Sequence, residues 1–336
     1  MKYCVDPFRD RVFHRFSYLV TFLTSKRDMP KKRRVKRIGV SWTQKPTTTQ
    51  KKKRKTESFN STKESLAIIS AFHNEEKRRK QIENDATLSE KEKEKALEEV
   101  ERRKMKLGGI EMYQAASIYG AKHYKCNAWV MPLMRTHLKS GSTFLDVGAI
   151  DHQYANIKDF TVIPIDLNPQ HKDVIKYDFF EFAHDMISKG KLPDRVIERD
   201  DNYKRIQVFD AVVLSLVVNF VGDPRARGNM IALSAHKRVL RKGGLLFITL
   251  PLACLENSRY MNATRFRKLV CELGFEVVVE TCTSKLYRGA FRSTCPFENY
   301  DVSTRTFKFK TEFPRKHLRK DKVKRNNFCV MLKNSN

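Results

Sequence analysis

The chain has 336 residues, with 67 Lys and Arg against 38 Asp and Glu, and its formal net charge is +29 at pH 7. A positive field of this size attracts a polyanion, and nucleic acid is the first candidate. No apolar run is long enough to span a bilayer, so no membrane partner is expected. The seven cysteines show no CxxC pair and no His/Cys metal spacing, which indicates reduced intracellular thiols and no bound metal.

Residues 1–60 read as a basic, mostly disordered tail. Two like-charge blocks, Lys-Lys-Arg-Arg-Val-Lys-Arg at 31–37 and Lys-Lys-Lys-Arg-Lys at 51–55, repel themselves and have little around them that could pack. Such clusters predict nuclear and nucleolar targeting with phosphate contact, and a merely solubilising tail is the alternative. Charged residues flank the mildly apolar stretch 16–24, so a secretory signal is not expected. Translation could also begin at Met29.

Residues 61–140 read as a helical region. The apolar positions of its first helix lie three apart, at Leu66, Ile69 and Phe72, which suits one buried face. A second, charge-laced helix has Thr87 or Ser89 as its N-cap and ends at Gly108-Gly109. Its charges predict a solvated surface, and an arm that contacts RNA or a ribosomal partner is the alternative.

A third helix is expected over residues 110–120. Tyr113, Gln114 and Ser117 occupy neighbouring positions on it, so their polar groups could face one pocket. A simple amphipathic helix explains the pattern equally well. Residues 128–134 predict another packed segment before the first strand.

From Gly141 to the end of the chain, apolar runs alternate with helical segments. Strands are expected, in order, at 144–147 and 161–165, with a third ending at 177–180, and then at 209–218, 245–251, 275–280, 304–310 and 328–332. Helices are expected at 227–240, closed by residues 241–244, and at 260–273, with a loop or insertion at 189–204. This alternation predicts an α/β fold with a mostly parallel, Rossmann-like sheet over residues 141–336.

Open α/β sheets bind ligands at the carboxyl ends of their strands. That edge would gather the candidate cofactor contacts Asp146, Gly148, Asp166, Asp178 and Ser215. Gly148 lets the backbone approach a ligand. Asp166 lies about 20 residues after the first strand and could accept both hydroxyls of a ribose. Asp178 could accept a hydrogen bond from an exocyclic amine. The alternative for each acid is a role in a turn or a helix cap.

The turn after the first strand reads Asp-Val-Gly-Ala-Ile, with one usable glycine rather than the three of GxGxxG. The Lys-Ser/Thr of a P-loop is absent too. A nucleoside-bearing cofactor without a pyrophosphate is therefore expected.

Five motifs carry a family resemblance. They are DVGAI, IDLNP, YDFF, FDAVVLSLVVNFV and RKGGLLFITLP, and in this order they resemble the Rossmann-like S-adenosylmethionine-dependent methyltransferases over residues 141–335. Within that group the chain is most similar to the fungal 25S ribosomal RNA adenine-N(1) methyltransferase family, through Leu107-Gly108-Gly109, Tyr113-Gln114-Ala115-Ala116-Ser117, the run from Ser215 to Val221, Pro224, Arg225 and Arg227-Gly228. The resemblance implies S-adenosylmethionine as the cofactor, with Gly148 and Asp166 among its contacts.

The resemblance also implies a reaction: methylation of N1 of an adenine in 25S rRNA, within a pre-ribosomal particle. The lone pair of N1 needs no deprotonation, so the enzyme mainly positions the reacting atoms. Asn219 is the candidate for binding the adenine edge, and Asp223 for offsetting the charge of the product. A turn role for Asn219, and an N-cap role for Asp223 before Pro224, are the alternatives.

Because N1 lies on the Watson–Crick edge, the target must be unpaired or flipped out. Arg225 and Arg227 could hold RNA phosphate, or could be solvated arginines. The basic run at 315–325 would add affinity without sequence information.

Related animal proteins are regarded as S-adenosylmethionine sensors. A non-catalytic sensor that acts through a protein partner is therefore the alternative function, and a methyltransferase for a protein substrate is a weaker one. The high positive charge favours the RNA methyltransferase, since a sensor needs no affinity for a polyanion. A monomer is expected.

Overall fold

The computed structural model of the chain describes residues 62–319 and 323–334, which belong to one compact unit. The expected basic tail, with its clusters at 31–37 and 51–55, lies outside the described residues. The helices of the described residues are α3 (Thr62–Glu83), α4 (Glu90–Lys106), α5 (Gly109–Tyr124), α6 (Asn127–His137), α7 (Phe179–Lys189), α8 (Asp194–Ile197), α9 (Pro224–Ala235), α10 (Ala253–Glu256) and α11 (Ala263–Glu272), with a 3-10 helix η1 (Asp201–Arg205). Within the described ranges, none of these helices has the length and hydrophobicity that crossing a membrane requires.

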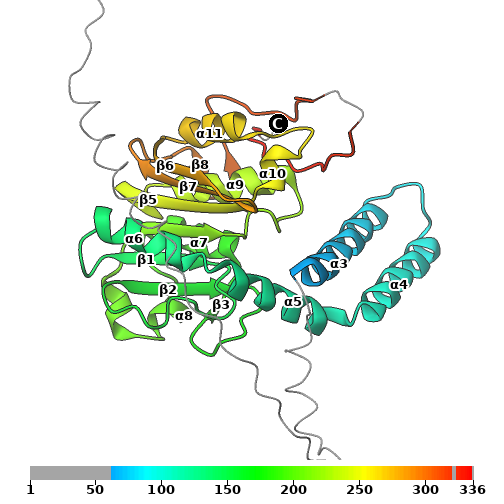
Figure 1. The fold of residues 1–336 in the computed structure, drawn as a ribbon, viewed down its shortest axis with the longest axis horizontal. Coiled ribbons are helices and arrows are strands. Elements are labelled where there is room, and N and C mark those ends of the chain that lie inside the picture. Colours follow the sequence, from blue (N-terminus) through cyan, green and yellow to red (C-terminus); the bar gives the residue numbers. More distant parts are fainter. Residues whose placement is uncertain (1–61, 320–322, 335–336) are drawn as a thin grey trace, which may run out of the picture. The chain divides into compact units, whose positions relative to one another are not determined.

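Seven strands form one sheet in the order β3-β2-β1-β4-β5-β7-β6 (Figure 1). They are β1 (Thr143–Val147), β2 (Thr161–Asp166), β3 (Ile175–Lys176), β4 (Phe209–Ser215), β5 (Leu240–Pro251), β6 (Phe275–Cys282) and β7 (Leu286–Ser293). Strands β1 to β5 pair in parallel, and β7 is antiparallel to both β5 and β6. The strand order reverses between β1 and β4, which is where doubly wound sheets bind ligands. The predicted Rossmann-like α/β fold is confirmed.

Helices cover both faces of the sheet. One face packs against α7, α9 and α11, and its strand residues include Leu145, Leu214 and Ile248. The other face packs against α6, with Phe144, Val213 and Phe247 from the strands. The apolar runs of the central strands are buried on both sides, as a parallel sheet requires. Helix α6, from the expected helical region, is thus part of the sheet's own core.

Helix α3 packs against α4 and α5 (Figure 1). Ile69 and Phe72 are buried, in agreement with the predicted face of α3, while the side chain of Leu66 lies outside what the structure describes. Ser89 is the N-cap of α4 and forms a capping box with Glu92. The buried Lys104 pairs with Glu76 of α3 and Glu101 of its own helix, which ties α3 to α4.

The expectations for residues 227–244 and 328–332 were wrong, and the strand expected to end at 177–180 ends at Lys176. The helix predicted at 227–240 spans Pro224–Ala235 and β5 begins at Leu240, so residues 241–244 belong to a strand instead of closing a helix. Gly243 has φ +77° there, and the β4–β5 register shifts between Phe209 and Ala211, so an irregular strand start resembled a helix end. The segment 328–332 makes an isolated bridge between Phe313 and Leu332 rather than a strand.

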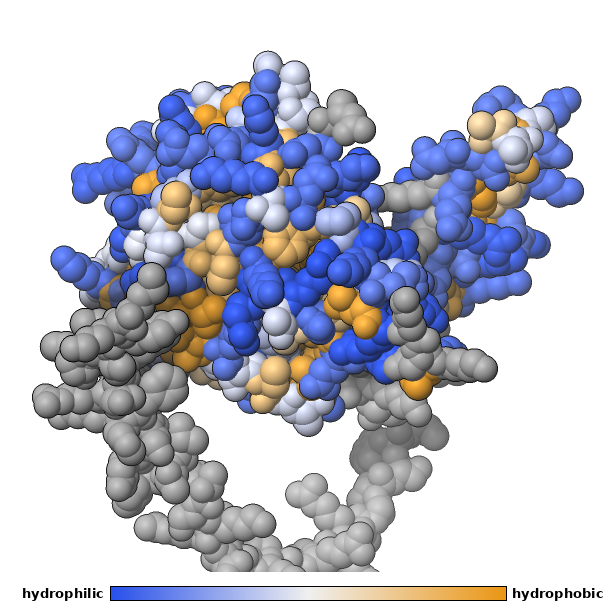
Figure 2. Space-filling model, turned by 90° about the horizontal axis from the view of Figure 1, so that it is seen from above, coloured by the Kyte–Doolittle hydropathy of each residue, from blue (hydrophilic) through white to orange (hydrophobic). Residues whose placement is uncertain are grey.

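Other expected elements differ in extent. The loop at 189–204 contains the short helices α8 and η1, and the strand at 304–310 shortens to β9 (Thr306–Phe307), which pairs with β8 (Tyr300–Asp301). Strand β7 was not predicted at all. On the face seen in Figure 2, hydrophilic residues dominate the surface and hydrophobic residues form small separate groups.

Candidate functional site

The turn after β1 requires a glycine. Gly148 has φ +74°, and its N–H and that of Ala149 donate to the carbonyl oxygen of Ile165 at 2.9 and 3.1 Å. A Cβ added at Gly148 would lie 3.1 Å from Cγ2 of Val217, which follows β4. Both the left-handed backbone and the close approach therefore favour glycine at this position. The turn brings the ends of β1, β2 and β4 together at one edge.

Asp166 ends β2 and faces this turn. Its Oδ1 accepts a hydrogen bond from the N–H of Asn168 at 2.7 Å, and its Oδ2 accepts one from the N–H of Ile150 at 3.4 Å. Burial raises the pKa of the Asp166 carboxyl, against the lowering by these two hydrogen bonds. The next residue, Leu167, is 58% exposed.

Three predicted site residues have buried polar side-chain atoms without a hydrogen-bond partner in the described ranges. Oδ2 of Asp146, Oγ of Ser215 and Oδ1 of Asn219 have no hydrogen-bond partner among the described residues. Asp146 is only 1% exposed, and burial, together with the Asp166 and Asp151 carboxylates, raises the pKa of its carboxyl well above the usual range. An unpartnered buried polar atom costs free energy, so each of these three atoms is a candidate for a ligand contact, and the contact itself stays a prediction.

The backbone at this edge is strained as well. Ile150, His152 and Leu216 have φ of +36°, +55° and +59°, in the left-handed region that side chains disfavour. Such conformations cost on the order of 1–3 kcal/mol each and cluster at ligand sites. They surround the same turn and the end of β4.

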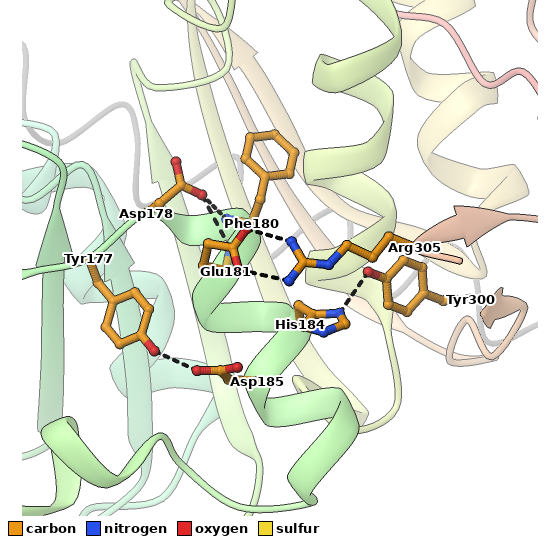
Figure 3. Close-up of polar contacts among 8 residues, drawn as sticks. All are labelled: Tyr177, Asp178, Phe180, Glu181, His184, Asp185, Tyr300 and Arg305. Carbon is orange, nitrogen blue, oxygen red and sulfur yellow. Dashed lines mark hydrogen bonds and ion pairs between the residues drawn. The ribbon is translucent and has the colours of Figure 1, made fainter. Parts of the chain in front are cut away.

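Asp178 is the N-cap of α7. Its Oδ1 accepts hydrogen bonds from the N–H groups of Phe180 and Glu181 at 2.7 and 3.2 Å (Figure 3). The structure thus places Asp178 in the capping role that was its alternative, and a cofactor contact stays a prediction. The same helix binds the β8–β9 hairpin, because Glu181 pairs with Arg305 and His184 lies 3.1 Å from the hydroxyl of Tyr300 (Figure 3).

Asp223 is the N-cap of α9. Its Oδ1 accepts from the N–H groups of Arg225 and Ala226 at 2.5 and 3.0 Å, and the residue is exposed. Of the two candidate catalytic residues, Asn219 therefore keeps an unpartnered oxygen while an oxygen of Asp223 is occupied by the backbone.

Arg227 is not an RNA-facing arginine, and this expectation was wrong. It is 6% exposed, and its guanidinium donates to the carbonyl oxygens of Val221 at 2.7 Å and Cys329 at 2.9 Å while lying over the ring of Phe328. The C-terminal segment thereby holds the loop that carries Asn219 and Asp223. The phosphate role proposed for Arg225 stays a prediction.

Helices α3 and α5 contact the same loop. The ring of Phe220, next to Asn219, lies 5.2 Å from that of His73, and Nε2 of His73 lies 3.4 Å from the hydroxyl of Tyr113. Burial raises the pKa of the Tyr113 phenol, and the Asp166 carboxylate adds to the effect. The ring of Tyr113 also stacks on that of Phe72 at 4.7 Å, so it packs between α3 and α5, and a pocket-facing role stays a prediction. The hydroxyl of Ser117 donates to the carbonyl of Tyr113.

Comparison with known proteins gives a specific match. A family model described as "25S rRNA (adenine(2142)-N(1))-methyltransferase, Bmt2" matches residues 98–330. The 25S rRNA (adenine(2142)-N(1))-methyltransferase of Saccharomyces cerevisiae is 32% identical over 193 residues, which cover 54% of this chain and 50% of the relative. The chain thus spans about half the length of this relative.

Solved structures show weaker similarity. A methyltransferase from Archaeoglobus fulgidus matches with 12% identity and a TM-score of 0.35, over 51% of this chain and 93% of that one. Magnesium protoporphyrin IX methyltransferase from Synechocystis PCC 6803 matches with 12% identity and a TM-score of 0.35, over 70% and 99% of the two chains. The family model covers more than half of the chain and includes the whole site. The chain therefore belongs to the family described as 25S rRNA (adenine(2142)-N(1))-methyltransferase, Bmt2.

Proposed function

We propose that the chain is an S-adenosylmethionine-dependent methyltransferase that methylates N1 of an adenine in 25S large-subunit rRNA during ribosome biogenesis. The observation that carries the proposal is the buried, unpartnered carboxylate oxygen of Asp146, beside Gly148 and Asp166 at one edge of the sheet. In a chain of this family, such an edge suits a cationic, ribose-bearing cofactor.

The residues present fit S-adenosylmethionine. Asp166 is placed to accept hydrogen bonds from the two ribose hydroxyls, and Gly148 leaves room for the nucleoside where a Cβ would fill it. The exposed Leu167 beside Asp166 can pack on the purine. Asp178 could still accept from the purine amine with its second oxygen. Bound S-adenosylmethionine supplies an electrophilic methyl group.

The chain's own task is then to position the adenine. Asn219 can bind the base edge through the amide oxygen that lacks a protein partner. Helix α9 and Arg227 hold its loop, and the cluster of Phe220 with His73 supports it from the other side. No general base is needed, because N1 carries a free lone pair, so alignment supplies most of the rate.

The test is methyl transfer to RNA. The full chain is incubated with methyl-labelled S-adenosylmethionine and unmodified large-subunit RNA, and the product is mapped by reverse transcription, which N1-methyladenine blocks. We expect one labelled adenine. Binding of the cofactor without transfer to RNA would contradict the proposal and favour the sensor that acts through a protein partner.

Two matched variants assign the loop residues. Asn219→Ala should lower the methylation rate by about 10- to 100-fold, because an orienting contact in the transition state is lost. Asp223→Asn keeps an N-cap acceptor and should change the rate by less than about threefold if Asp223 is only a cap. A large loss in Asp223→Asn with unchanged stability would restore the catalytic role of its charge.

We further propose a nuclear, nucleolar protein with three parts: the basic tail at 1–60, the helical region at 61–140 and the methyltransferase domain at 141–336. A monomer working on a pre-ribosomal particle is the expected state. Deleting residues 31–55 should reduce nuclear localisation without changing cofactor affinity. Unchanged localisation would contradict the targeting role.

A further inference from the structure

On one face of the sheet, the side chains change from mostly apolar to polar along the strands. The face covered by α6 presents three successive rows of side chains, read across β1, β4, β5 and β7 from the strand register. The first row is Phe144, Ala211, Leu245 and Arg292, the second is Asp146, Val213, Phe247 and Ala290, and the third is Ser215, Thr249 and Arg288. The rows are largely apolar at first and fully polar at the carboxyl edge.

The polar groups of this edge are buried and unsatisfied. Thr249 is 0% exposed and Asp146 is 1% exposed. In the described part of the chain, Oγ1 of Thr249, Oγ of Ser215, Nε of Arg288 and Oδ2 of Asp146 all lack a hydrogen-bond partner. The hydroxyls of Ser215 and Thr249 face the Cys126 thiol, which is a weak hydrogen-bond partner, so this row keeps hydrogen-bonding capacity for another molecule.

Two further residues close the cluster from α6 and from the loop after β1. Cys126, the N-cap of α6, is buried, and the hydroxyl of the buried Tyr154 also lacks a partner in the described ranges. Burial raises the pKa of the Cys126 thiol. The Ser215 and Thr249 hydroxyls and the Arg288 guanidinium oppose that shift, while the Asp146 carboxylate adds to it. The strand register already places Ser215, Thr249 and Arg288 side by side, and these interactions place the Cys126 thiol and the Asp146 carboxylate near them.

The chemistry of these groups is complementary to a zwitterion. A guanidinium with two hydroxyl donors suits a carboxylate, and a carboxylate suits an ammonium. An α-amino acid group carries both charges on one carbon. The cluster lies next to Gly148, where the nucleoside is proposed to bind, so one ligand can reach both places.

We propose that Arg288, with Ser215 and Thr249, binds the carboxylate of the amino acid end of S-adenosylmethionine, and that Asp146 binds its ammonium. This assignment rests on the proposed cofactor and adds Arg288 and Thr249 to its site. It gives the polar row an occupant and gives the buried Asp146 carboxylate a cation.

Paired ligands test the assignment. S-Adenosylhomocysteine carries the amino acid group, and 5′-methylthioadenosine has the same nucleoside thioether without it. In Arg288→Met, calorimetry should show affinity for S-adenosylhomocysteine reduced by about 10- to 100-fold, the effect of losing a charge-assisted hydrogen bond. Affinity for 5′-methylthioadenosine should stay within about twofold, which also shows that the site is folded. Arg288→Lys should recover part of the loss, because the charge remains.

The matched control is Arg292→Met, on the same strand and face but at the far end of the rows. It should bind both ligands like the parent. Equal loss of both ligands in Arg288→Met, or loss of RNA methylation with unchanged affinity for S-adenosylhomocysteine, would overturn the assignment, and the second result would place Arg288 on the RNA side. If the parent chain bound no S-adenosylhomocysteine, the proposed function would fail as well.

Discussion

The two faces of the central sheet differ at the same edge. Towards the carboxyl end of β5, the face against α9 and α11 stays apolar, with Ile248 and Leu250 buried and Tyr287 opposite Leu250 on β7. On the other face, the same stretch carries Thr249 and Arg288. Burial of the first set stabilises the fold, whereas unpartnered polar groups in the second cost stability. The comparison indicates that one face is built for folding and the other for a ligand.

The largest effect on stability should come from the apolar face. Leu214→Ala removes a fully buried side chain and should lower the free energy of unfolding by about 2–5 kcal/mol, measured by denaturant titration. Affinity for S-adenosylhomocysteine, measured where the variant is folded, should stay close to that of the parent. A stable Leu214→Ala protein with lost affinity would break the distinction between the faces.

The largest effect on binding should come from Asp166. Asp166→Asn should weaken S-adenosylhomocysteine binding by about 1.5–3 kcal/mol, since charge-assisted hydrogen bonds to the ribose are lost. In the parent, affinity should fall as the pH decreases through the raised pKa of Asp166, because the protonated carboxyl is a poorer acceptor. Asp166→Asn should lack this pH dependence, and an identical profile in the variant would exclude Asp166 as its source.

Asp178 is the matched acid for this test, because it caps α7, a helix that packs on the apolar face of the sheet. Asp178→Ala removes the N-cap of α7 and should cost about 1 kcal/mol of stability, seen as a lower denaturant midpoint. Affinity for S-adenosylhomocysteine should not change if the residue only caps the helix. A clear loss of affinity would show that Asp178 also contacts the cofactor.

The smallest expected effect is a change in Tm at Asp146. It distinguishes the two faces most clearly, because a substitution here should raise stability, whereas one on the apolar face should lower it. Asp146→Asn removes a buried carboxylate whose folded pKa is raised, so the ligand-free protein should gain Tm, by about 2–4 °C for each kcal/mol. Above the raised folded pKa of Asp146, the buried carboxylate lowers the stability of the parent protein in full. Below the pKa of Asp146 in the unfolded chain, the carboxyl is protonated in both states and this loss disappears. The gain in Tm of Asp146→Asn should therefore shrink as the pH falls. Affinity for S-adenosylhomocysteine should decrease. A loss of Tm in Asp146→Asn would contradict the unpartnered state of the carboxylate.

Much of the site could be predicted from the sequence because it lies on local motifs. Asp146, Gly148, Asp166 and Ser215 each follow or end an apolar run, and parallel strands bring such ends to one edge. The roles of Asp178 and Asp223 were harder to predict, because an acid before a helix suits both a cap and a ligand contact. The local backbone decides between them, and here its N–H groups donate hydrogen bonds to both side chains.

The rest depends on contacts between distant segments. Strand β7 was missed because Gly289, Arg288 and Arg292 interrupt its apolar residues, and only its pairing with β5 and β6 makes the pattern a strand. Arg288 was missed with it, although the alternation of Arg292, Ala290 and Arg288 is visible in the sequence. Arg227 appeared exposed because a cation is rarely buried, and its carbonyl partner on Cys329 is remote in sequence.

A crystal structure of the full chain with S-adenosylhomocysteine would test the central claim most directly. The ribose should lie against Asp166, the nucleoside should pass Gly148, and the amino acid group should fill the polar row with its carboxylate on Arg288 and its ammonium on Asp146. A ligand bound elsewhere, or one whose amino acid group points away from Ser215, Thr249 and Arg288, would contradict the division of the sheet into a folding face and a binding face.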